Sequence, residues 1–378
     1  MGNRTTTQKS PEREIKQSKH LINPFQILKE LPVPLFQSQC VLHKHELLIC
    51  GGWHERACYS YHTLKNEYKL ICKYPSDVYL DGHCVVKLVD DKNKDNNQIT
   101  LLSFGGLYNH TLVMKYVSIW SFISNKSNKL NNYNQWIPFK DNRNHPIIIG
   151  KYENHYYQGA RAMIGGSNNK LLFITYFTNN ISVFDLNTFQ FIKHDKILFT
   201  NIAYFHCFVP KSENGQGQEM MKKNQERKKQ NYQMLLFCKN TGLSIEYDED
   251  SNTFQFHQLP ICDDIAPLHR YAYVCINDII LFFGGWDINK SFFSKFVYKY
   301  SIGENKLMTF ENTLPIPLGD CVAILNENDT DIHIIGGLDN KNTKLSTHMK
   351  TKVRVWDPSL LVIILFFWIK QIYFTNNK

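Results

Sequence analysis

The chain contains several residue types that can do chemistry, and their spacing limits what that chemistry is. Among its 378 residues are 20 tyrosines, 15 histidines and 10 cysteines. Its densest acidic group is Asp248-Glu249-Asp250, and paired carboxylates are what general acid–base hydrolysis uses. A solvated turn between two strand-like segments explains this group. The cysteines show no CxxC or metal-ligand spacing, and no phosphate loop or nucleophile elbow occurs. We therefore predict no catalytic residue, no metal and no cofactor.

A second group of residues is suited to recognition rather than catalysis. Tryptophan, tyrosine and arginine are the side chains that most often anchor protein interfaces. The candidates follow glycine pairs or lie in connecting segments, and they are Trp53, Arg56, Tyr108, Arg270 and Trp286. The two tryptophans have an alternative interpretation, in which they pack sideways between structural units.

The elements that must position these residues repeat along the chain. An apolar segment ends in a glycine pair at Gly51-Gly52, Gly105-Gly106, Gly284-Gly285 and Gly336-Gly337. Two of the intervals are about 50 residues, which is typical of a chain that stacks one small unit. Because glycine tolerates a positive φ and close approach by another backbone, the pairs predict sharp turns in crowded places.

Each glycine pair lies within a pattern of four strands. One strand-like segment precedes the apolar strand, as in QCVLHK before HELLICGG, and two follow it, as in ACYSYH and YKLICKYP. Their β-branched and aromatic residues alternate with short polar turns, as expected for strands. Each unit is therefore predicted to be four short antiparallel strands, which is one blade of a β-propeller.

The repeat resembles that of kelch-repeat proteins, from roughly Phe25 to Trp356. A kelch unit has a hydrophobic second strand ending in Gly-Gly, an aromatic residue in its third strand, and an aromatic residue in its fourth strand before Leu-Pro. The third-strand aromatic residues here would be Tyr59 or Tyr61, Trp120, Phe184, Tyr247, Tyr300 and Trp356. The resemblance implies an all-β fold, a kelch-type propeller of the galactose-oxidase-like superfamily.

Two central units depart from the pattern. Gly165-Gly166 precedes the apolar strand Leu171–Thr175, so we interpret it as the turn into that strand, with Tyr176 near the usual glycine position. In the next unit Lys239-Asn240 replaces the glycine pair. Counting both units, we predict six blades of four antiparallel strands, with five or seven as alternatives.

The ring is predicted to close through its N-terminal segment. The last unit offers three strands, in DCVAIL, DIHIIGG and TKVRVW, whereas FQILKELPVPL near the start is similar to fourth-strand segments elsewhere. Phe25–Lys29 is therefore expected to be the outer strand of the last blade, unless this arm packs elsewhere. The predicted domains are a disordered basic arm at 1–24, the propeller at 25–356 and an apolar tail at 357–378.

Charge and inserts exclude one class of partner. The net charge is +9, but residues 1–24 and 211–231 are both net basic and the remainder is only mildly so. No aromatic-basic motif occurs, so we predict no nucleic-acid partner.

Polar inserts at Asp90–Gln98, Lys211–Gln230 and Asn326–Asp331 fall between first and second strands, and their composition predicts disorder. The basic run Lys222–Lys229 suits an acidic partner or an anionic lipid surface.

The cysteines and the two ends of the chain indicate the cellular compartment of the protein. Most cysteines lie in apolar strands and no apolar signal-peptide run begins the chain, which favours reduced thiols in the cytoplasm. The start Met-Gly-Asn-Arg-Thr-Thr fits N-myristoylation at Gly2, which would make the protein membrane-associated. The apolar run Leu360–Ile369 is short for a spanning helix, which needs about 20 residues. Three interpretations of this run are open: it is an additional strand or packed tail, a marginal membrane anchor, or an ill-fitting end of the chain.

These observations predict a non-catalytic scaffold that binds a protein or peptide partner through loops on one propeller face. The segments after the glycine pairs and the fourth-to-first connections share that face, while the strands hold them rigid. One alternative is the same propeller tethered to a membrane through Gly2 or Leu360–Ile369. Another is a propeller enzyme, because the architecture also resembles copper-radical sugar oxidases. That resemblance implies tyrosine and histidine ligands with a Cys–Tyr crosslink, for which no local motif is present.

Overall fold

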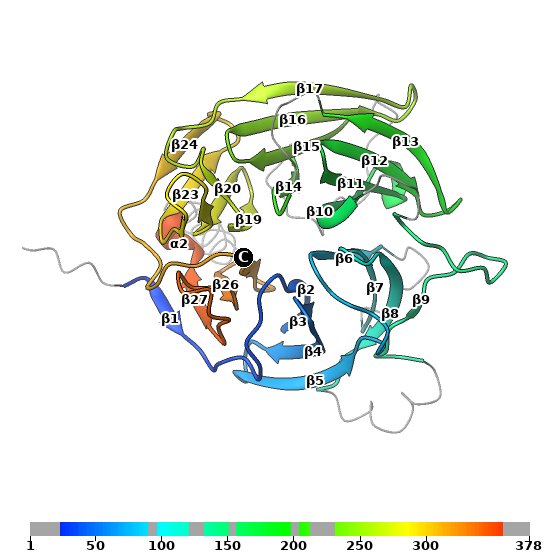
Figure 1. Cartoon of the computed structure of the whole chain (residues 1–378), viewed down its shortest axis with the longest axis horizontal. Helices are drawn as coiled ribbons and strands as arrows, with labels where there is room; N and C mark the ends of the chain where they lie inside the picture. Colours follow the sequence, from blue (N-terminus) through cyan, green and yellow to red (C-terminus); the bar gives the residue numbers. More distant parts are fainter. Residues whose placement is uncertain are drawn as a thin grey trace, which may run out of the picture.

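The computed structural model describes residues 23–89, 97–120, 132–150, 156–197, 204–211 and 231–357. Across these ranges the strands form six four-stranded antiparallel sheets and one small three-stranded sheet. The four-stranded sheets follow one another around a central axis, each with its first strand innermost (Figure 1). We number these sheets from first to sixth in chain order, starting at β2.

From the axis outward, the first sheet contains β2 (Gln39–His43), β3 (Glu46–Gly52), β4 (Glu55–His62) and β5 (Glu67–Lys73). The second sheet contains β6 (His83–Leu88), β7 (Gln98–Gly105), β8 (His110–Val117) and β9 (Ile137–Pro138). The third sheet contains β10 (Tyr156–Gly165), β11 (Leu171–Phe177), β12 (Asn180–Asp185) and β13 (Gln190–Lys196). A 3-10 turn, η1 (Ser167–Asn169), joins β10 to β11.

The fourth sheet contains β14 (Cys207–Pro210), β15 (Asn231–Cys238), β16 (Thr241–Asp248) and β17 (Thr253–Leu259). The fifth sheet contains β19 (Ala272–Ile276), β20 (Ile279–Phe283), β23 (Val297–Ser301) and β24 (Lys306–Thr309). The sixth sheet contains β25 (Val322–Leu325), β26 (Asp331–Ile335), β27 (His348–Lys352) and β1 (Phe25–Ile27). The small sheet contains β18 (Leu268–His269), β21 (Trp286–Asp287) and β22 (Phe292–Phe293), and the helix α2 spans Val353–Trp356.

Burial explains the two sequence patterns of the strands. The second strands β3, β20 and β26 are buried along their whole length, so they read as continuous apolar runs. The outer strands β13 and β17 alternate between exposed and half-buried residues, because one face packs on the sheet and the other meets water. The core therefore lies between neighbouring sheets, as separate apolar clusters around the ring.

The last sheet takes its outer strand from the start of the chain, as predicted. β1 pairs antiparallel with β27, with Phe25 opposite Thr351 and Ile27 opposite Met349. Phe25 is buried, and its ring lies 5.6 Å from that of Trp356 and 6.5 Å from that of Phe283. In Figure 1 β1 lies outside β27, so the ring closes without a covalent link.

The glycine pairs lie between two loops. The first glycine faces the connection into the next sheet, and a Cβ on Gly284 would overlap the carbonyl oxygen of Leu318. The second glycine faces the connection into its own sheet, and a Cβ on Gly285 would lie 3.0 Å from the carbonyl oxygen of His269. Gly284 also has a φ of 66°, in the left-handed region that side chains disfavour.

The two divergent sheets follow their predicted patterns. Gly165 ends β10 and Gly166 precedes η1, so this pair is the turn into β11. Tyr176 lies near the end of β11, and Lys239-Asn240 forms the two-residue turn between β15 and β16. Neither sheet has a glycine pair after its second strand.

Three expectations about local structure are wrong. Trp120 follows β8, which ends at Val117, and the aromatic residue within that strand is Tyr116. Trp356 is in α2 rather than in a third strand, because β27 ends at Lys352. The segment Asn326–Asp331 is ordered, since the Asn326 side-chain oxygen accepts hydrogen bonds from the backbone of Thr330 and Asp331.

The two other expected inserts also lie between first and second strands. Asp90–Gln98 leads from β6 into β7, and Lys211–Gln230 leads from β14 into β15. Most residues of both inserts are outside the described ranges. The predicted arm at 1–24, except its last two residues, and the tail at 358–378 lie outside them as well.

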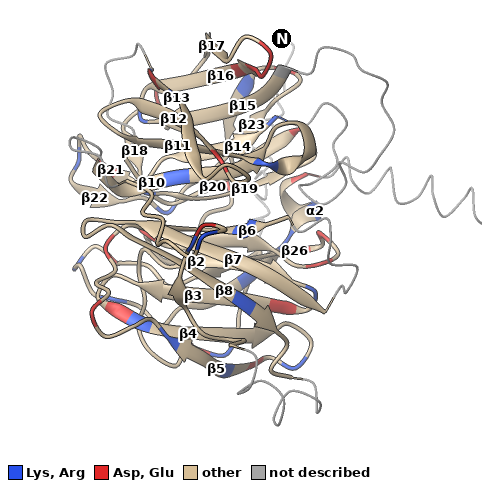
Figure 2. Cartoon of the chain, turned by 90° about the vertical axis from the view of Figure 1, so that its right-hand side faces the viewer, with Lys and Arg blue, Asp and Glu red and all other residues tan. Residues whose placement is uncertain are grey.

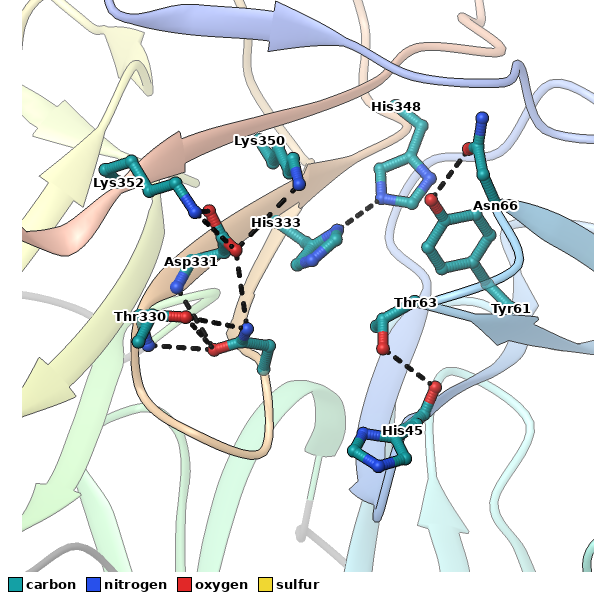
Figure 3. Close-up of polar contacts among 11 residues, drawn as sticks. His45, Tyr61, Thr63, Asn66, Thr330, Asp331, His333, His348, Lys350 and Lys352 are labelled. Atoms are coloured by element: carbon teal, nitrogen blue, oxygen red, sulfur yellow. Dashed lines mark hydrogen bonds and ion pairs between the residues drawn. The ribbon is translucent and has the colours of Figure 1, made fainter.

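Buried histidines occupy the junction of the sixth and first sheets. His333 and His348 share a hydrogen bond of 2.9 Å, and His348 also bonds the hydroxyl of Tyr68 from the first sheet. Figure 3 shows this pair beside Tyr61, with Asp331, Lys350 and Lys352 on the other side. Burial lowers the pKa of His333 to about 4 and that of His348 well below its usual value. Asp331 opposes the shift of His333, and Lys350 adds to both shifts.

Replacing Gly284 by alanine should destabilise the fold. The new methyl group meets the Leu318 carbonyl and forces a left-handed alanine, so we expect a loss of about 2–4 kcal/mol in the free energy of unfolding. Gly303→Ala is the matched control, because it is exposed and its Cβ would come no closer than 3.8 Å to another atom. Urea unfolding measures both, and equal stabilities would contradict the role given to the pair.

Truncating Phe25 should loosen the closure of the ring. We expect Phe25→Ala to lower the free energy of unfolding by about 3–5 kcal/mol, the usual cost of deleting a buried phenyl ring. Ile27→Ala removes a side chain that is 61% exposed from the same strand, and should change little. Thermal and urea unfolding provide the readout. A Phe25→Ala protein as stable as the Ile27→Ala protein would show that β1 adds no closure.

Acid should destabilise the fold through its buried histidines. An unfolded histidine takes up a proton near pH 6.5, whereas His333 stays neutral in the fold down to about pH 4. The unfolded state therefore binds more protons, and the free energy of unfolding falls by about 2 kcal/mol per such histidine from pH 7 to pH 5. His333→Gln should reduce this loss by that amount in urea titrations. His257→Gln, on the exposed edge strand, controls for the substitution, and an unchanged pH slope in His333→Gln would refute the assignment.

Candidate partner-binding face

One end of the ring carries the residues expected to bind a partner. It is formed by the connections between second and third strands and by the segments that lead into each innermost strand, and we call it the loop face. The small sheet β18–β21–β22 belongs to this face and lies at the opposite end of the ring from α2 (Figure 2). Lysine, arginine, aspartate and glutamate are interspersed on the side drawn there, without a field of one sign.

Six residues form a circle where the loop face meets the central axis, and we call this circle the entry ring. Five lie one or two residues before an innermost strand and one lies within β10, and all six have a positive φ: Gln37, Gly82, Gly159, Phe205, Arg270 and Asp320. Backbone hydrogen bonds of 2.8–3.0 Å link neighbours, from Gly159 to Gly82, from Phe205 to Gly159, from Asp320 to Arg270 and from Gln37 to Asp320. The backbone therefore fixes the side chains at the mouth of the ring.

A buried ion pair lies on one side of the entry ring. The Arg270 guanidinium donates to an Asp320 carboxylate oxygen at 3.2 Å, and the Asp320 side chain is 1% exposed. Burial raises the pKa of Asp320, and the positive charges of Arg270 and Arg161 oppose that shift. The second Asp320 oxygen, the Arg270 Nε and the Ser38 hydroxyl have no hydrogen-bond partner within the described chain. These three atoms are buried, so the ion pair stabilises this side of the entry ring from within.

Arg161 faces the axis from the opposite side. Burial lowers the pKa of His83 to about 4 and that of His206 well below its usual value, and the Arg161 charge adds to both shifts. These histidines belong to the sheets on either side, so the guanidinium lies where three innermost strands meet. Its carbon is 5.5 Å from the centre of the Phe205 ring, and the Arg270 guanidinium lies 5.3 Å from the same ring. Both arginines thus flank one aromatic side chain.

Aromatic side chains lead from the entry ring across the third sheet. Tyr204 contacts Phe205 with ring centres 4.4 Å apart, and Phe177 contacts Tyr156 at 5.4 Å. A shallow cavity of about 450 Å³, largely open to solvent, lies here and is lined by Tyr156, Gln158, Phe177, Thr178 and Tyr204. The connection between the second and third strands is two residues long in the third and fourth sheets, as it is in the first.

The predicted anchors fall into two groups. Trp53 and Trp286 are half-buried and pack with Phe36, Phe293 and Leu338 in one apolar cluster. Lys344 lies over the Trp53 ring at 4.5 Å, so this tryptophan is covered by neighbouring sheets. The alternative of sideways packing therefore describes the two indoles well, although both belong to loops of the loop face.

The three remaining predicted anchors differ in how firmly neighbouring groups hold their side chains. The half-buried Arg56 donates to the Tyr74 carbonyl at 3.4 Å, and Arg270 is held by Asp320. Tyr108 is 59% exposed, and its ring lies 5.6 Å from that of Tyr79, which is 58% exposed. Tyr108 is therefore the predicted anchor best placed to meet a partner, with Tyr79 as a neighbour that the sequence reasoning missed.

Sequence reasoning also missed Arg161, Tyr204 and Asp320. Arg161 lies inside a strand of the most divergent unit, and Tyr204 precedes a short innermost strand without a repeat signature. Asp320 stands directly before the last innermost strand. Its only signal was its place in a fourth-to-first connection, the same type of segment that drew attention to Arg270.

No group of three or more histidine, cysteine, aspartate or glutamate side chains in the described ranges is placed to hold a metal ion. Asp248 accepts backbone hydrogen bonds from Asp250 and Ser251, as a turn residue does. All ten cysteines are free thiols. Within the parts of the chain that the structure covers, we found no helix with the length and apolarity to cross a membrane. Gly2 and Leu360–Ile369 lie outside those parts.

Comparison with known proteins identifies the fold. No family model matches the sequence, and no curated protein matches it. The solved structure of YjhT aligns with 85% of this chain and 96% of its own, with a TM-score of 0.57 and 12% sequence identity. The fold is a β-propeller. A chain from the crystal structure of the mitotic checkpoint complex aligns over 93% of this chain and 99% of its own, with a TM-score of 0.48 and 8% identity. At 12% identity, the likeness to YjhT is one of fold alone.

Proposed function

We propose that this protein is a six-bladed kelch-type propeller that binds a protein or peptide partner through its loop face. The observation that carries the proposal is the gathering of exposed aromatic rings, two arginines and a cavity of about 450 Å³ at this one end of the ring. Aromatic and arginine side chains beside a pocket are the usual anchors of an interface.

The repeat type and the number of blades belong to this proposal. The six four-stranded sheets and the six left-handed residues of the entry ring support six units. Glycine pairs closing β3, β7, β20 and β26 support the kelch type, since each is wedged between two connections of the loop face.

We further propose that the protein acts by binding rather than by catalysis, and in the cytoplasm. The densest acidic group serves a turn, with Glu249 accepting hydrogen bonds from Ser167. Burial raises the pKa of Cys84 and Cys238 to about 11, which keeps these cysteines as thiols. Tethering through Gly2 or Leu360–Ile369 stays a prediction, as does an oxidase-like site.

Partner capture with paired variants tests the binding face. The double variant Tyr79→Ala/Tyr108→Ala removes two exposed rings and should lose the partners that wild-type protein captures, by at least about tenfold in recovered amount. The control Leu64→Ala/Leu70→Ala removes two exposed residues away from the loop face and should retain them. Mass spectrometry with labelled lysates gives the ratio.

Thermal unfolding of both double variants shows that each remains folded. Trp53→Ala/Trp286→Ala is less informative, because those indoles also support the cluster around Phe293. The same partner list from the tyrosine variant and from wild type would overturn the assignment of the face.

A further inference from the structure

Three cysteines lie in a row across the first sheet. Cys50 in β3 is directly opposite Cys58 in β4, and Cys58 is directly opposite Cys72 in β5. Directly opposed residues of antiparallel strands have Cα atoms about 4.5–5.5 Å apart. That separation lies within the range that a disulfide spans. The central cysteine is therefore placed to bond either neighbour, but not both.

The surroundings of the row favour a reactive central sulfur. The Trp136 indole N–H donates to the Cys58 sulfur at 3.3 Å. Burial opposes ionisation of Cys58, but its polar neighbours, among them the Trp136 indole N–H, hold its pKa well below the usual value. The neighbouring Cys58 sulfur and burial raise the pKa of Cys50 and Cys72. Of the three thiols, Cys58 is therefore the one that ionises first.

Access to the row is from its outer end. Cys50 and Cys58 are fully buried, whereas Cys72 is half-buried on the outer strand β5 and contacts the Met114 sulfur at 3.8 Å. A small oxidant therefore meets Cys72 first.

We propose that Cys72, Cys58 and Cys50 form a thiol relay that a hydroperoxide oxidises. The hydroperoxide transfers one oxygen to the Cys72 thiol, giving a sulfenic acid and an alcohol or water. The Cys58 thiolate attacks the Cys72 sulfur, a disulfide forms, and hydroxide leaves and takes up a proton as water. Cys50 then attacks the Cys58 sulfur, forming the Cys50–Cys58 disulfide and returning Cys72 as a thiol, which gains the proton that Cys50 lost. The peroxide is the sole oxidant and accepts two electrons.

The end of the relay lies at the loop face. Cys50 directly precedes Gly51-Gly52, the loop that follows carries Trp53, and Arg56 lies in β4 just before Cys58. A Cys50–Cys58 bond ties the two ends of this loop together. Oxidation would thus fix a loop of the binding face, a consequence that rests on the proposed function, whereas the oxidation itself does not.

Three other strand cysteines are not directly opposite another cysteine. Cys84, Cys207 and Cys275 are opposite phenylalanine or isoleucine residues in the sheet register. They serve as internal controls for oxidation.

The experiment treats reduced full-length protein with hydrogen peroxide, alkylates the remaining thiols and maps disulfides by mass spectrometry. Wild-type protein should lose alkylation at Cys50 and Cys58. Cys50→Ser should stop at a Cys58–Cys72 disulfide, and Cys72→Ser should oxidise at least about tenfold more slowly, because the entry thiol is gone. Cys84→Ser should behave as wild type. Thermal unfolding shows that each variant is folded.

Folded Cys58→Ser protein should form neither disulfide. Equal disulfide formation in this variant, bonds between other cysteines, or wild-type thiols that peroxide leaves untouched would each overturn the relay. Because the mapping needs no partner, its result is independent of the capture experiment. Loss of the partner list in the tyrosine variant with no disulfide in wild type would refute the relay and leave the proposed function intact.

Discussion

The fold depends on how closely the connections of neighbouring sheets approach each second strand. The Gly336 backbone lies against the Leu35 carbonyl in the same way that Gly284 lies against Leu318, and both backbones are left-handed. Gly337 and Gly285 then donate to those carbonyls at 2.7 and 2.8 Å. A side chain at either position would push one sheet away from the next. The glycine pair therefore sets the spacing of the ring rather than only a local turn.

A second repeated contact holds the outer half of several sheets. The hydroxyl of a third-strand tyrosine donates to an asparagine five residues later, in Tyr61 to Asn66, Tyr247 to Asn252 and Tyr300 to Asn305. Each of these asparagines has a positive φ in the turn before the fourth strand. In the third sheet Phe184 and Phe189 occupy the corresponding positions, so the polar pair is replaced as a unit. This explains physically why an aromatic residue recurs in the third strand.

The sequence predicted those parts of the fold that depend on residue type alone. Glycine pairs, buried apolar runs and the N-terminal strand at Phe25 all carry a chemical signal that survives without structural context. The placement of Trp120 and Trp356 failed because an aromatic residue fits a strand, a loop or a helical turn when each of them is buried. The entry ring could not be predicted, since Gln37 and Phe205 adopt left-handed backbones that their residue types disfavour. For the site, only Tyr108 and Arg270 could be selected, and Arg161 could not.

The features that suit binding occur where the repeat is broken. In the first, second, fifth and sixth sheets the glycine pairs keep the loops pressed against the connections, which leaves little room at the surface. The third and fourth sheets lack the pair after their second strands, and the cavity beside Tyr204 opens there. Arg161 also belongs to the third sheet, where β10 departs from regular pairing near Tyr156. Regular units thus supply the rigid frame, and the irregular ones supply its distinctive surface.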